Sequence, residues 1–129
     1  MVIVDTSVWV QFLRALGSPE HRAVDYLLAQ RQVLMVGPVL AELLQGARTP
    51  QEFAPLQSRL IALPYATETH GTWLRVAELS YQLRQRGQKV GLTDLLIAAL
   101  AIEHDCPVYT LDAHFQRIPG VRLYEPQGR

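Results

Sequence analysis

Short runs of apolar residues alternate with longer amphipathic segments along this chain of 129 residues. The runs cover residues 1–4, 33–36, 108–111 and 121–124, and a weaker candidate follows 60–63 and ends near Ala66. None of them alternates apolar with polar residues, so each is typical of a strand buried on both faces. This order predicts an α/β fold, a three-layer α/β/α sandwich with a central parallel sheet of four to five strands.

The segments between these runs carry helix signals. The predicted N-cap residues of four helices are Thr6 or Ser7, Ser18, Thr49 and Thr93. Further helices are expected at 37–46, from about 67 to 86 before Gly87, and at 113–117. Since no repeat, linker or low-complexity tract occurs, we expect one domain over residues 1–129.

Four acidic residues fall where strands and helices meet. Asp5 ends the first strand and Asp112 the fourth, Asp94 begins an apolar helix, and Glu42 lies in the second turn of the helix after the second strand. The carboxyl ends of parallel strands lie at one edge of the sheet, where ligands bind. We therefore expect the four acids to converge on one crevice, although they are far apart in sequence.

Each of these acids also has an ordinary structural explanation. Asp94 suits the first turn of a helix, where its charge is favourable to the helix dipole, and Asp112 suits an N-cap or an Asx-turn. Glu42 is then a solvated surface acid and Asp5 a cap of the first helix. The joint placement of Asp5 and Asp94 beside dense apolar segments favours a shared site.

Such a site needs positive charge to balance its carboxylates. Two carboxylates ~5 Å apart at an effective dielectric near 20 repel each other by about 3 kcal/mol, and a whole domain is stable by only ~5 to 15 kcal/mol. No lysine or arginine lies within six residues of Asp5 or within four of Asp94. A set of oxygen ligands indicates bound Mg²⁺, with Mn²⁺ as an alternative, rather than zinc.

The four histidines do not form a zinc motif, since no two of them are spaced as i and i+4. His21, His70 and His104 are expected at the surface. His114 follows Asp112 by two residues, which would let it touch phosphate or water in the crevice. No P-loop, dinucleotide fingerprint or serine-hydrolase elbow occurs, so metal-bound acids favour phosphodiester hydrolysis.

The charge balance allows an RNA substrate. The 12 Lys+Arg and 12 Asp+Glu residues give a formal net charge of zero, but setting the four acids aside leaves a balance of +4. Candidate RNA contacts are Arg14, Arg48, Arg84, Arg86 and Lys89, although the last three equally suit the carboxyl end of a helix.

Two further features bear on location. The longest apolar runs, such as 95–102, fall short of the ~20 residues that a membrane span needs. A single cysteine, Cys106, is typical of the cytoplasm.

Four segments contain these residues in order: VIVDTS at 2–7, LAELLQG at 40–46, LTDLLIAA at 92–99 and YTLDAHF at 109–115. Together they resemble the motifs of PIN-domain nucleases, and within that family the VapC-type toxins of toxin–antitoxin pairs. The resemblance covers essentially the whole chain. It implies that Asp5, Glu42, Asp94 and Asp112 are catalytic and hold the metal, and that Thr6, Ser7 and Thr110 orient ligands or water. Many relatives carry a further acid where this chain has His114.

The resemblance also implies a Mg²⁺- or Mn²⁺-dependent endoribonuclease that acts as the toxin of a VapBC-type pair in the cytoplasm. It implies a homodimer, and a small antitoxin protein whose carboxyl-terminal segment fills the acidic groove. Trp9, Phe12 and Tyr26 are candidates for a protein interface, with core packing as the alternative.

Other functions stay open at this point. A small phosphatase or a phosphoacceptor receiver domain also uses strand-end aspartates with Mg²⁺. Ser7 stands where the phosphatase needs a second acid. A receiver domain needs an early pair of acids and a late lysine, and Lys89 is the only lysine. A non-enzymatic alternative is a catalytically silent interaction module of the same fold that binds a basic partner peptide in its acidic groove.

Overall fold

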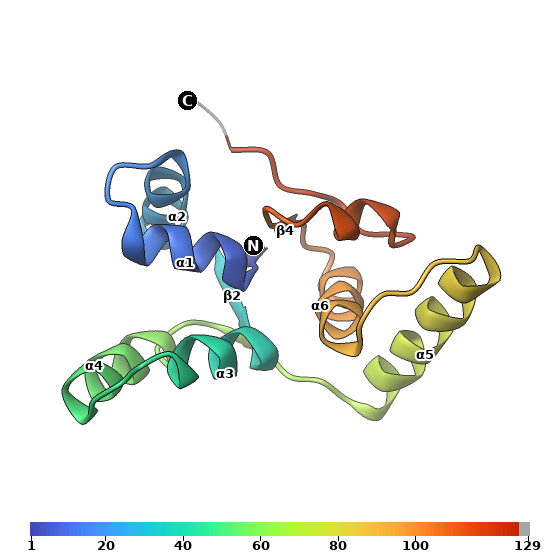
Figure 1. Ribbon diagram of the computed structural model, residues 1–129, viewed down its shortest axis with the longest axis horizontal. Coiled ribbons are helices and arrows are strands. Elements are labelled where there is room, and N and C mark those ends of the chain that lie inside the picture. The colour runs from blue at the N-terminus through green and yellow to red at the C-terminus, as the bar shows by residue number, and fades with distance from the viewer. Residues whose placement is uncertain (127–129) are drawn as a thin grey trace.

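The computed structural model describes residues 1–126, which form four strands, six α-helices and one 3₁₀ helix (Figure 1). The strands are β1 (Val2–Val4), β2 (Val33–Val36), β3 (Tyr65–Ala66) and β4 (Val108–Tyr109). They pair in parallel in the order β3-β2-β1-β4, with Val2 opposite Val33 and Ile3 opposite Val108. The predicted parallel sheet is confirmed, with four strands.

The helices lie on both faces of this sheet. They are α1 (Thr6–Arg14), α2 (Pro19–Ala29), α3 (Gly37–Gln45), α4 (Pro50–Leu60), α5 (His70–Gln85), α6 (Leu92–Glu103) and the 3₁₀ helix η1 (Ala113–Arg117). The chain steps from β1 to β2 to β3 in one direction and then returns past β1 to β4. Because parallel crossovers are right-handed, α1–α4 cover one face and α5 and α6 the other. Figure 1 shows this division, which confirms the three-layer sandwich.

The prediction of a strand at 121–124 is wrong, because this segment does not form an extended strand. Only an isolated bridge joins Leu123 to Val108, supported by hydrogen bonds from the Val108 amide to the Arg122 carbonyl (2.9 Å) and from the Tyr124 amide to the Val108 carbonyl (2.9 Å). Pro126 lacks an amide hydrogen, so the ladder cannot continue past it.

Two predicted helix caps are also wrong. Helix α1 has Asp5 at its N-cap position, with Thr6 and Ser7 inside the helix, and α6 begins at Leu92 after Gly91, so Thr93 is an internal residue. Ser18 and Thr49 do cap α2 and α4, where their side chains accept hydrogen bonds from backbone amides. The long helix α5 starts at His70, three residues later than expected, because Thr69 forms a capping box with Thr72.

The core centres on α6, in which every residue from 95 to 101 is buried. Trp9 is 3% exposed and belongs to this core, Phe12 packs against it, and Tyr26 is 61% exposed. Core packing therefore accounts for Trp9 and Phe12, and leaves Tyr26 as the one interface candidate of the three. Among the helices of residues 1–126, none is long and apolar enough to cross a bilayer.

Candidate active site

Asp5 and Asp112 meet because β1 and β4 are neighbours. Ile3 and Val4 pair with Val108 and Tyr109, and the Asp5 amide donates a hydrogen bond to the Tyr109 carbonyl at 2.9 Å. Both strands run in the same direction, so the residues that follow them emerge at one edge of the sheet. The predicted convergence of these two strand ends is what the structure shows.

Two hydroxyl groups fix the Asp5 carboxylate, which is 8% exposed. Ser7 Oγ and Thr110 Oγ1 both donate to Asp5 Oδ2, at 3.0 and 2.8 Å. The same hydroxyls accept hydrogen bonds from the amides of Leu111 (3.1 Å) and Asp112 (3.0 Å). This network joins the start of α1 to the segment after β4, and both of its bonds to the carboxylate use Oδ2.

Asp94 lies in the first turn of α6 and faces the other acids of the edge. Partial burial raises the pKa of its carboxyl group, and the negative charges of Asp5, Asp112 and Glu42 raise this pKa further. His114 opposes the rise. The charges of the other three predicted acids therefore all act on Asp94.

Asp112 both caps η1 and lies beside Asp94. Its Oδ1 caps η1 by accepting a hydrogen bond from the His114 amide at 2.9 Å, and it lies 3.1 Å from His114 Nδ1. Potential ligand atoms of Asp94, Asp112 and His114 lie within 4.8 Å of one another. The capping residue is thus also part of the acidic cluster.

Glu42 lies at the exposed rim of the cluster and accepts a hydrogen bond from Thr6 Oγ1 at 2.6 Å. Thr6, Glu42 and Arg14 line a cavity of about 230 Å³ between α1, α3 and α4. Arg48 lies in the segment before α4, and its backbone amide donates a hydrogen bond to Oε1 of Glu52, which lines the same cavity. Of the five predicted RNA contacts, Arg14 lines this cavity together with Glu42.

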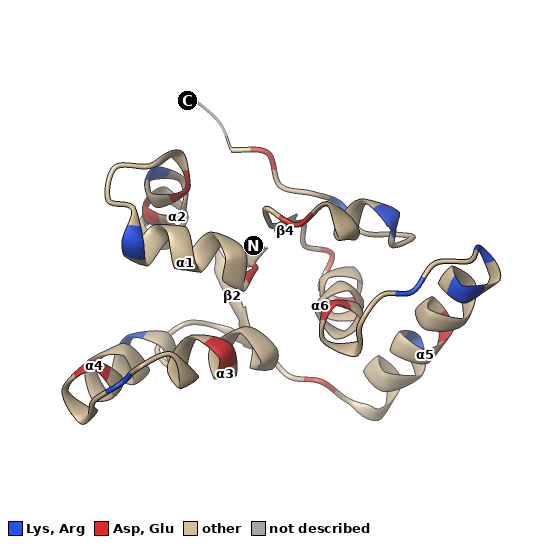
Figure 2. Ribbon diagram, in the orientation of Figure 1, with Lys and Arg blue, Asp and Glu red and all other residues tan. Residues whose placement is uncertain are grey.

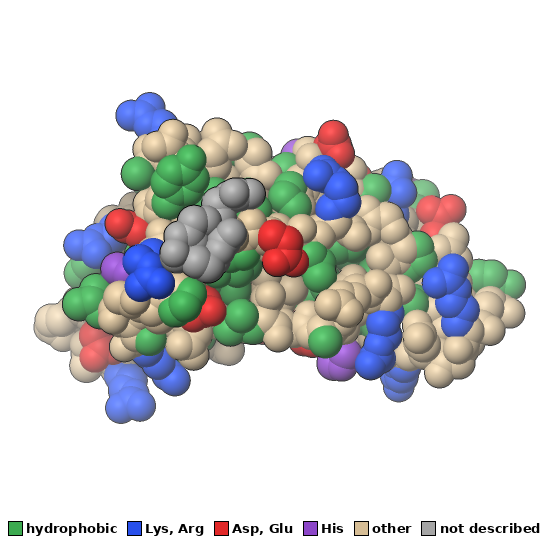
Figure 3. Space-filling view, turned by 90° about the horizontal axis from the view of Figure 1, so that it is seen from above, with side chains coloured by type: hydrophobic (Ala, Val, Ile, Leu, Met, Phe, Trp, Pro, Cys, Tyr) green, Lys and Arg blue, Asp and Glu red, His purple; other side chains and the backbone are tan. Residues whose placement is uncertain are grey.

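The other three candidate RNA contacts lie at the carboxyl end of α5 and in the loop that follows it. Arg84 is in the last turn of α5, Arg86 follows that helix, and Lys89 is in the loop that leads to α6. Figure 2 shows acidic residues after the strands and on several helices, and basic residues distributed over helices and loops. Figure 3 shows basic side chains scattered among acids on one face, with no continuous basic stripe there.

The acidic cluster has the chemistry of a divalent cation site. Across residues 1–126, no lysine or arginine forms an ion pair with Asp5, Glu42, Asp94 or Asp112. Carboxylates that repel one another and keep free oxygens suit a hard cation such as Mg²⁺ or Mn²⁺. The donor set therefore fits the metal that the sequence predicts.

The remaining histidines lie elsewhere. His70 and His104 are exposed, as predicted. His21 is only half-buried because its ring stacks on Phe12, with 5.0 Å between ring centroids. None of these three belongs to the acidic cluster.

The sequence analysis does not single out Glu68, which follows β3 at the same edge of the sheet. Its Oε2 is buried without a hydrogen-bond partner among the described residues. Burial of the Tyr65 hydroxyl raises the pKa of Tyr65, and the negative charge of Glu68 raises this pKa further. A Cβ at Gly37 would lie 2.8 Å from the Tyr65 hydroxyl, so glycine allows α3 to begin beside this pair. The signal in the sequence is an acid two residues after the weak strand candidate that ends near Ala66.

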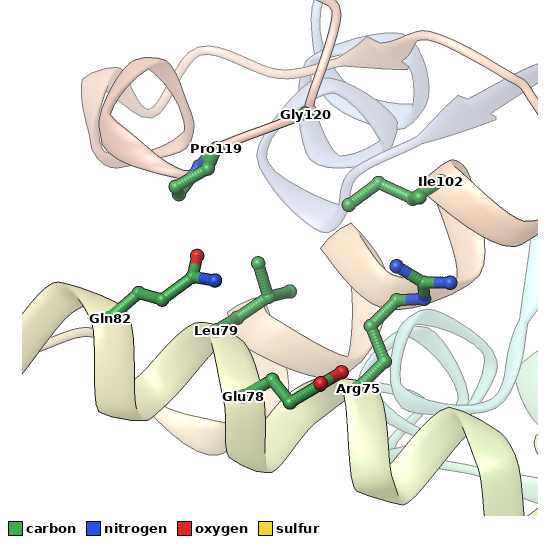
Figure 4. A pocket seen from close by; sticks show the side chains of 7 residues that line it. All are labelled: Arg75, Glu78, Leu79, Gln82, Ile102, Pro119 and Gly120. Carbon is green, nitrogen blue, oxygen red and sulfur yellow. The ribbon is translucent and has the colours of Figure 1, made fainter.

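A separate cavity of about 380 Å³ lies beyond the acidic cluster (Figure 4). Arg75, Glu78 and Gln82 of α5 and Ile102 of α6 surround it, with Pro119 and Gly120 opposite. Ile102 is eight residues after Asp94 on α6, a rise of about 12 Å along the helix. This cavity is therefore not part of the candidate active site.

Comparison with known proteins gives relatives along the whole chain. The chain is 34% identical over 125 residues to VapC ribonuclease Mb1587 of Mycobacterium bovis and to Ribonuclease VapC11 of Mycobacterium tuberculosis. Each alignment covers 94% of this chain and 93% of the relative. The fold is similar to that of VapBC2 from Rickettsia felis bound to a DNA fragment from their promoter, with a TM-score of 0.76, 26% identity and coverage of 96% of this chain and 98% of that one. VapBC-1 from nontypeable Haemophilus influenzae has a similar fold, with a TM-score of 0.79 at 18% identity and coverage of 97% and 98%.

The family assignment agrees with the geometry of the site. The family model of the PIN domain matches residues 2–121. This range includes all four acids and the strands and helices that position them. The chain therefore belongs to the PIN-domain family.

Proposed function

We propose that the protein is a metal-dependent endoribonuclease and the toxin of a VapBC-type toxin–antitoxin pair. The observation that carries the proposal is the crowding of Asp5, Glu42 and Asp112 around Asp94 without a compensating lysine or arginine in residues 1–126. Similarity to VapC ribonucleases over 94% of the chain supports RNA as the substrate.

In this proposal Asp5, Asp94 and Asp112 supply carboxylate oxygens to the cation, and Glu42 completes the set from the rim. A bound Mg²⁺ or Mn²⁺ ion supplies a nucleophile from water at neutral pH and offsets the charge of the phosphate. Without a cation the carboxylates would repel the phosphodiester, so RNA binding and metal binding are coupled.

Ser7 and Thr110 act as positioning residues. Both donate to Oδ2 of Asp5, which keeps the carboxylate in one orientation. Their contacts with the amides of Leu111 and Asp112 hold the segment after β4 against α1. Thr6 restrains Glu42 in the same way.

The proposed partner is a small antitoxin protein with a basic segment. The structural neighbours include VapBC complexes, and an acidic crevice attracts a lysine or arginine side chain. A homodimer in the cytoplasm is proposed on the family resemblance, and light scattering of the purified protein tests the dimer.

The decisive experiment incubates purified protein with RNA and Mg²⁺ or Mn²⁺. We expect cleavage that EDTA stops and that Asp5→Asn abolishes while circular dichroism shows an intact fold. Sequencing of RNA ends after brief induced expression, with Asp5→Asn as control, identifies the cleaved RNA. Full activity of the Asp5→Asn protein would exclude this proposal, and tight binding of a basic peptide without cleavage in Mn²⁺ would favour the silent interaction module.

A further inference from the structure

His114 places an imidazole at the edge of the acidic cluster. One of its ring nitrogens, with a carboxylate oxygen of Asp94 and one of Asp112, forms a group of possible ligand atoms within 4.8 Å of one another. In the described part of the chain, this is the one such group of three or more possible metal-binding residues. The side chain is 54% exposed, so the ring is open to solvent.

The neighbours of the ring decide which nitrogen is free. His114 Nδ1 lies 3.1 Å from Asp112 Oδ1, the same oxygen that accepts the His114 amide at 2.9 Å. With its proton on Nδ1, the ring donates to this carboxylate, and Nε2 keeps the lone pair. Histidines that bind metals commonly donate their other nitrogen to a carboxylate in this manner, which fixes the tautomer and raises the basicity of the ligand.

Capping of η1 does not explain the imidazole. The backbone amide of His114 already makes the capping contact with Asp112, and any residue except proline offers that amide. The cap therefore accounts for the amide and not for the ring, which contacts Asp112 through Nδ1.

We propose that His114 is a nitrogen ligand of the divalent cation and gives this site a preference for Mn²⁺ over Mg²⁺. The inference rests on the proposed function, because it concerns the metal of the same site. Mg²⁺ strongly favours oxygen ligands, whereas transition ions also accept imidazole. A neutral imidazole also carries one negative charge less than a carboxylate would. This difference lowers the affinity for Mg²⁺, the harder ion, more than the affinity for Mn²⁺.

Pulsed electron paramagnetic resonance of Mn²⁺ bound to the purified protein tests this contact directly. A nitrogen ligand couples to the electron spin of Mn²⁺, and oxygen ligands do not. We expect a ¹⁴N coupling in the wild-type protein that His114→Asn removes. His70→Asn is the matched control, since His70 is exposed and lies outside the cluster, and it should keep the coupling.

Titration of both ions by calorimetry gives a second readout that does not depend on activity. We expect His114→Asn to weaken Mn²⁺ binding by about tenfold or more. His114→Asp restores an oxygen ligand, and should shift the ratio of Mg²⁺ to Mn²⁺ affinity towards Mg²⁺ by about tenfold relative to the wild type.

The outcomes separate this inference from the proposed function. Bound Mn²⁺ that Asp94→Asn displaces but that shows no ¹⁴N coupling would overturn the role of His114 and leave the metal-dependent nuclease intact. A coupling that persists in His114→Asn, or an unchanged ratio of affinities in His114→Asp, would also overturn it. Absence of Mn²⁺ and Mg²⁺ binding in the wild type would overturn both proposals.

Discussion

The two ends of α6 carry carboxylates in opposite surroundings. Asp94, in the first turn, faces the negative charges of Asp5, Asp112 and Glu42. Glu103, in the last turn, accepts a hydrogen bond from Thr72 Oγ1 at 2.8 Å and lies 3.9 Å from Arg75 Nε. The helix dipole favours an acid at the first end and disfavours one at the second.

The helix dipole therefore does not explain which of the two carboxylates has a hydrogen-bonding and charged partner. The fold compensates Glu103, whose position is unfavourable, and leaves Asp94 beside further anions. Stability alone does not explain this crowding, because each added carboxylate raises the free energy of the metal-free protein. A cation that binds the folded state offsets this cost, so the comparison assigns function to one end of α6 and structure to the other.

The largest expected effect comes from removing the charge of Asp94. Asp94→Asn should reduce RNA cleavage at least about a hundredfold, because changes in the surroundings of metal ligands alone cost ~10- to 100-fold. Rates of cleavage of a labelled RNA in Mg²⁺ and Mn²⁺ measure the loss. Glu103→Gln makes the same chemical change on the same helix and should keep activity within about twofold. Equal losses in both variants would break the functional comparison.

The hydroxyl network around Asp5 should have the next largest effect. Ser7→Ala removes one of the two donors to Asp5 Oδ2 and the acceptor of the Leu111 amide. We expect an ~10- to 100-fold loss of cleavage with weaker metal binding, because a less restrained carboxylate is a poorer ligand. Thr72→Val is the control, since it removes a hydroxyl at the far end of α6. Unchanged metal affinity in Ser7→Ala would contradict a positioning role.

Sequence reasoning placed Asp5 and Asp112 correctly because both positions follow from strand direction. Adjacent parallel strands deliver the residues after them to one edge, whatever their separation in sequence. The type of each element near Asp94 and Glu42 was likewise readable from apolar periodicity. The parallel sheet, its layers and the convergence of the acids could therefore be predicted.

The polar contacts of Thr6 and Ser7 could not be predicted, because their partners are distant in sequence. Local rules assign such hydroxyls to helix capping, whereas here Thr6 binds Glu42, 36 positions away, and Ser7 accepts the amide of Leu111, 104 positions away. The orientation of the His114 ring depends on the same kind of tertiary contact. The family resemblance indicates Thr6, Ser7 and Thr110 as positioning residues, but the atoms that their hydroxyls contact require the packed structure.

At the structural end of α6, Thr72→Val should lower stability without changing activity. Thr72 is fully buried, donates to Glu103, and accepts a hydrogen bond from the Thr69 amide at 3.0 Å. Valine has the same shape but leaves both partners unsatisfied, at a cost of about 1–3 kcal/mol. Urea unfolding measures this loss. An unaltered free energy of unfolding would show that water replaces the hydroxyl and that this end of the helix is less constrained than its contacts indicate.

The smallest expected effect concerns the stability of the metal-free protein. The pKa of Asp94 is raised in the folded state, first by burial and then by Asp5, so folding binds a proton that the unfolded chain releases more readily. The contribution of this proton uptake to the free energy of unfolding is favourable at acid pH and is lost as pH rises through the folded-state pKa of Asp94. At neutral pH in EDTA, Asp94→Asn should therefore raise the melting temperature, by about 2 °C because solvent screens a partly exposed group.

This gain should vanish at acid pH, where Asp94 is protonated, and reverse in Mg²⁺ or Mn²⁺, where only the wild type keeps the ligand. Glu103→Gln under the same conditions should give no gain, since its carboxylate is paired. A metal-free Asp94→Asn protein that melts below the wild type at neutral pH would mean that the Asp94 carboxylate stabilises the fold by itself. The two ends of α6 would then differ in degree rather than in kind, and the crowding of acids would need another explanation than the cation it attracts.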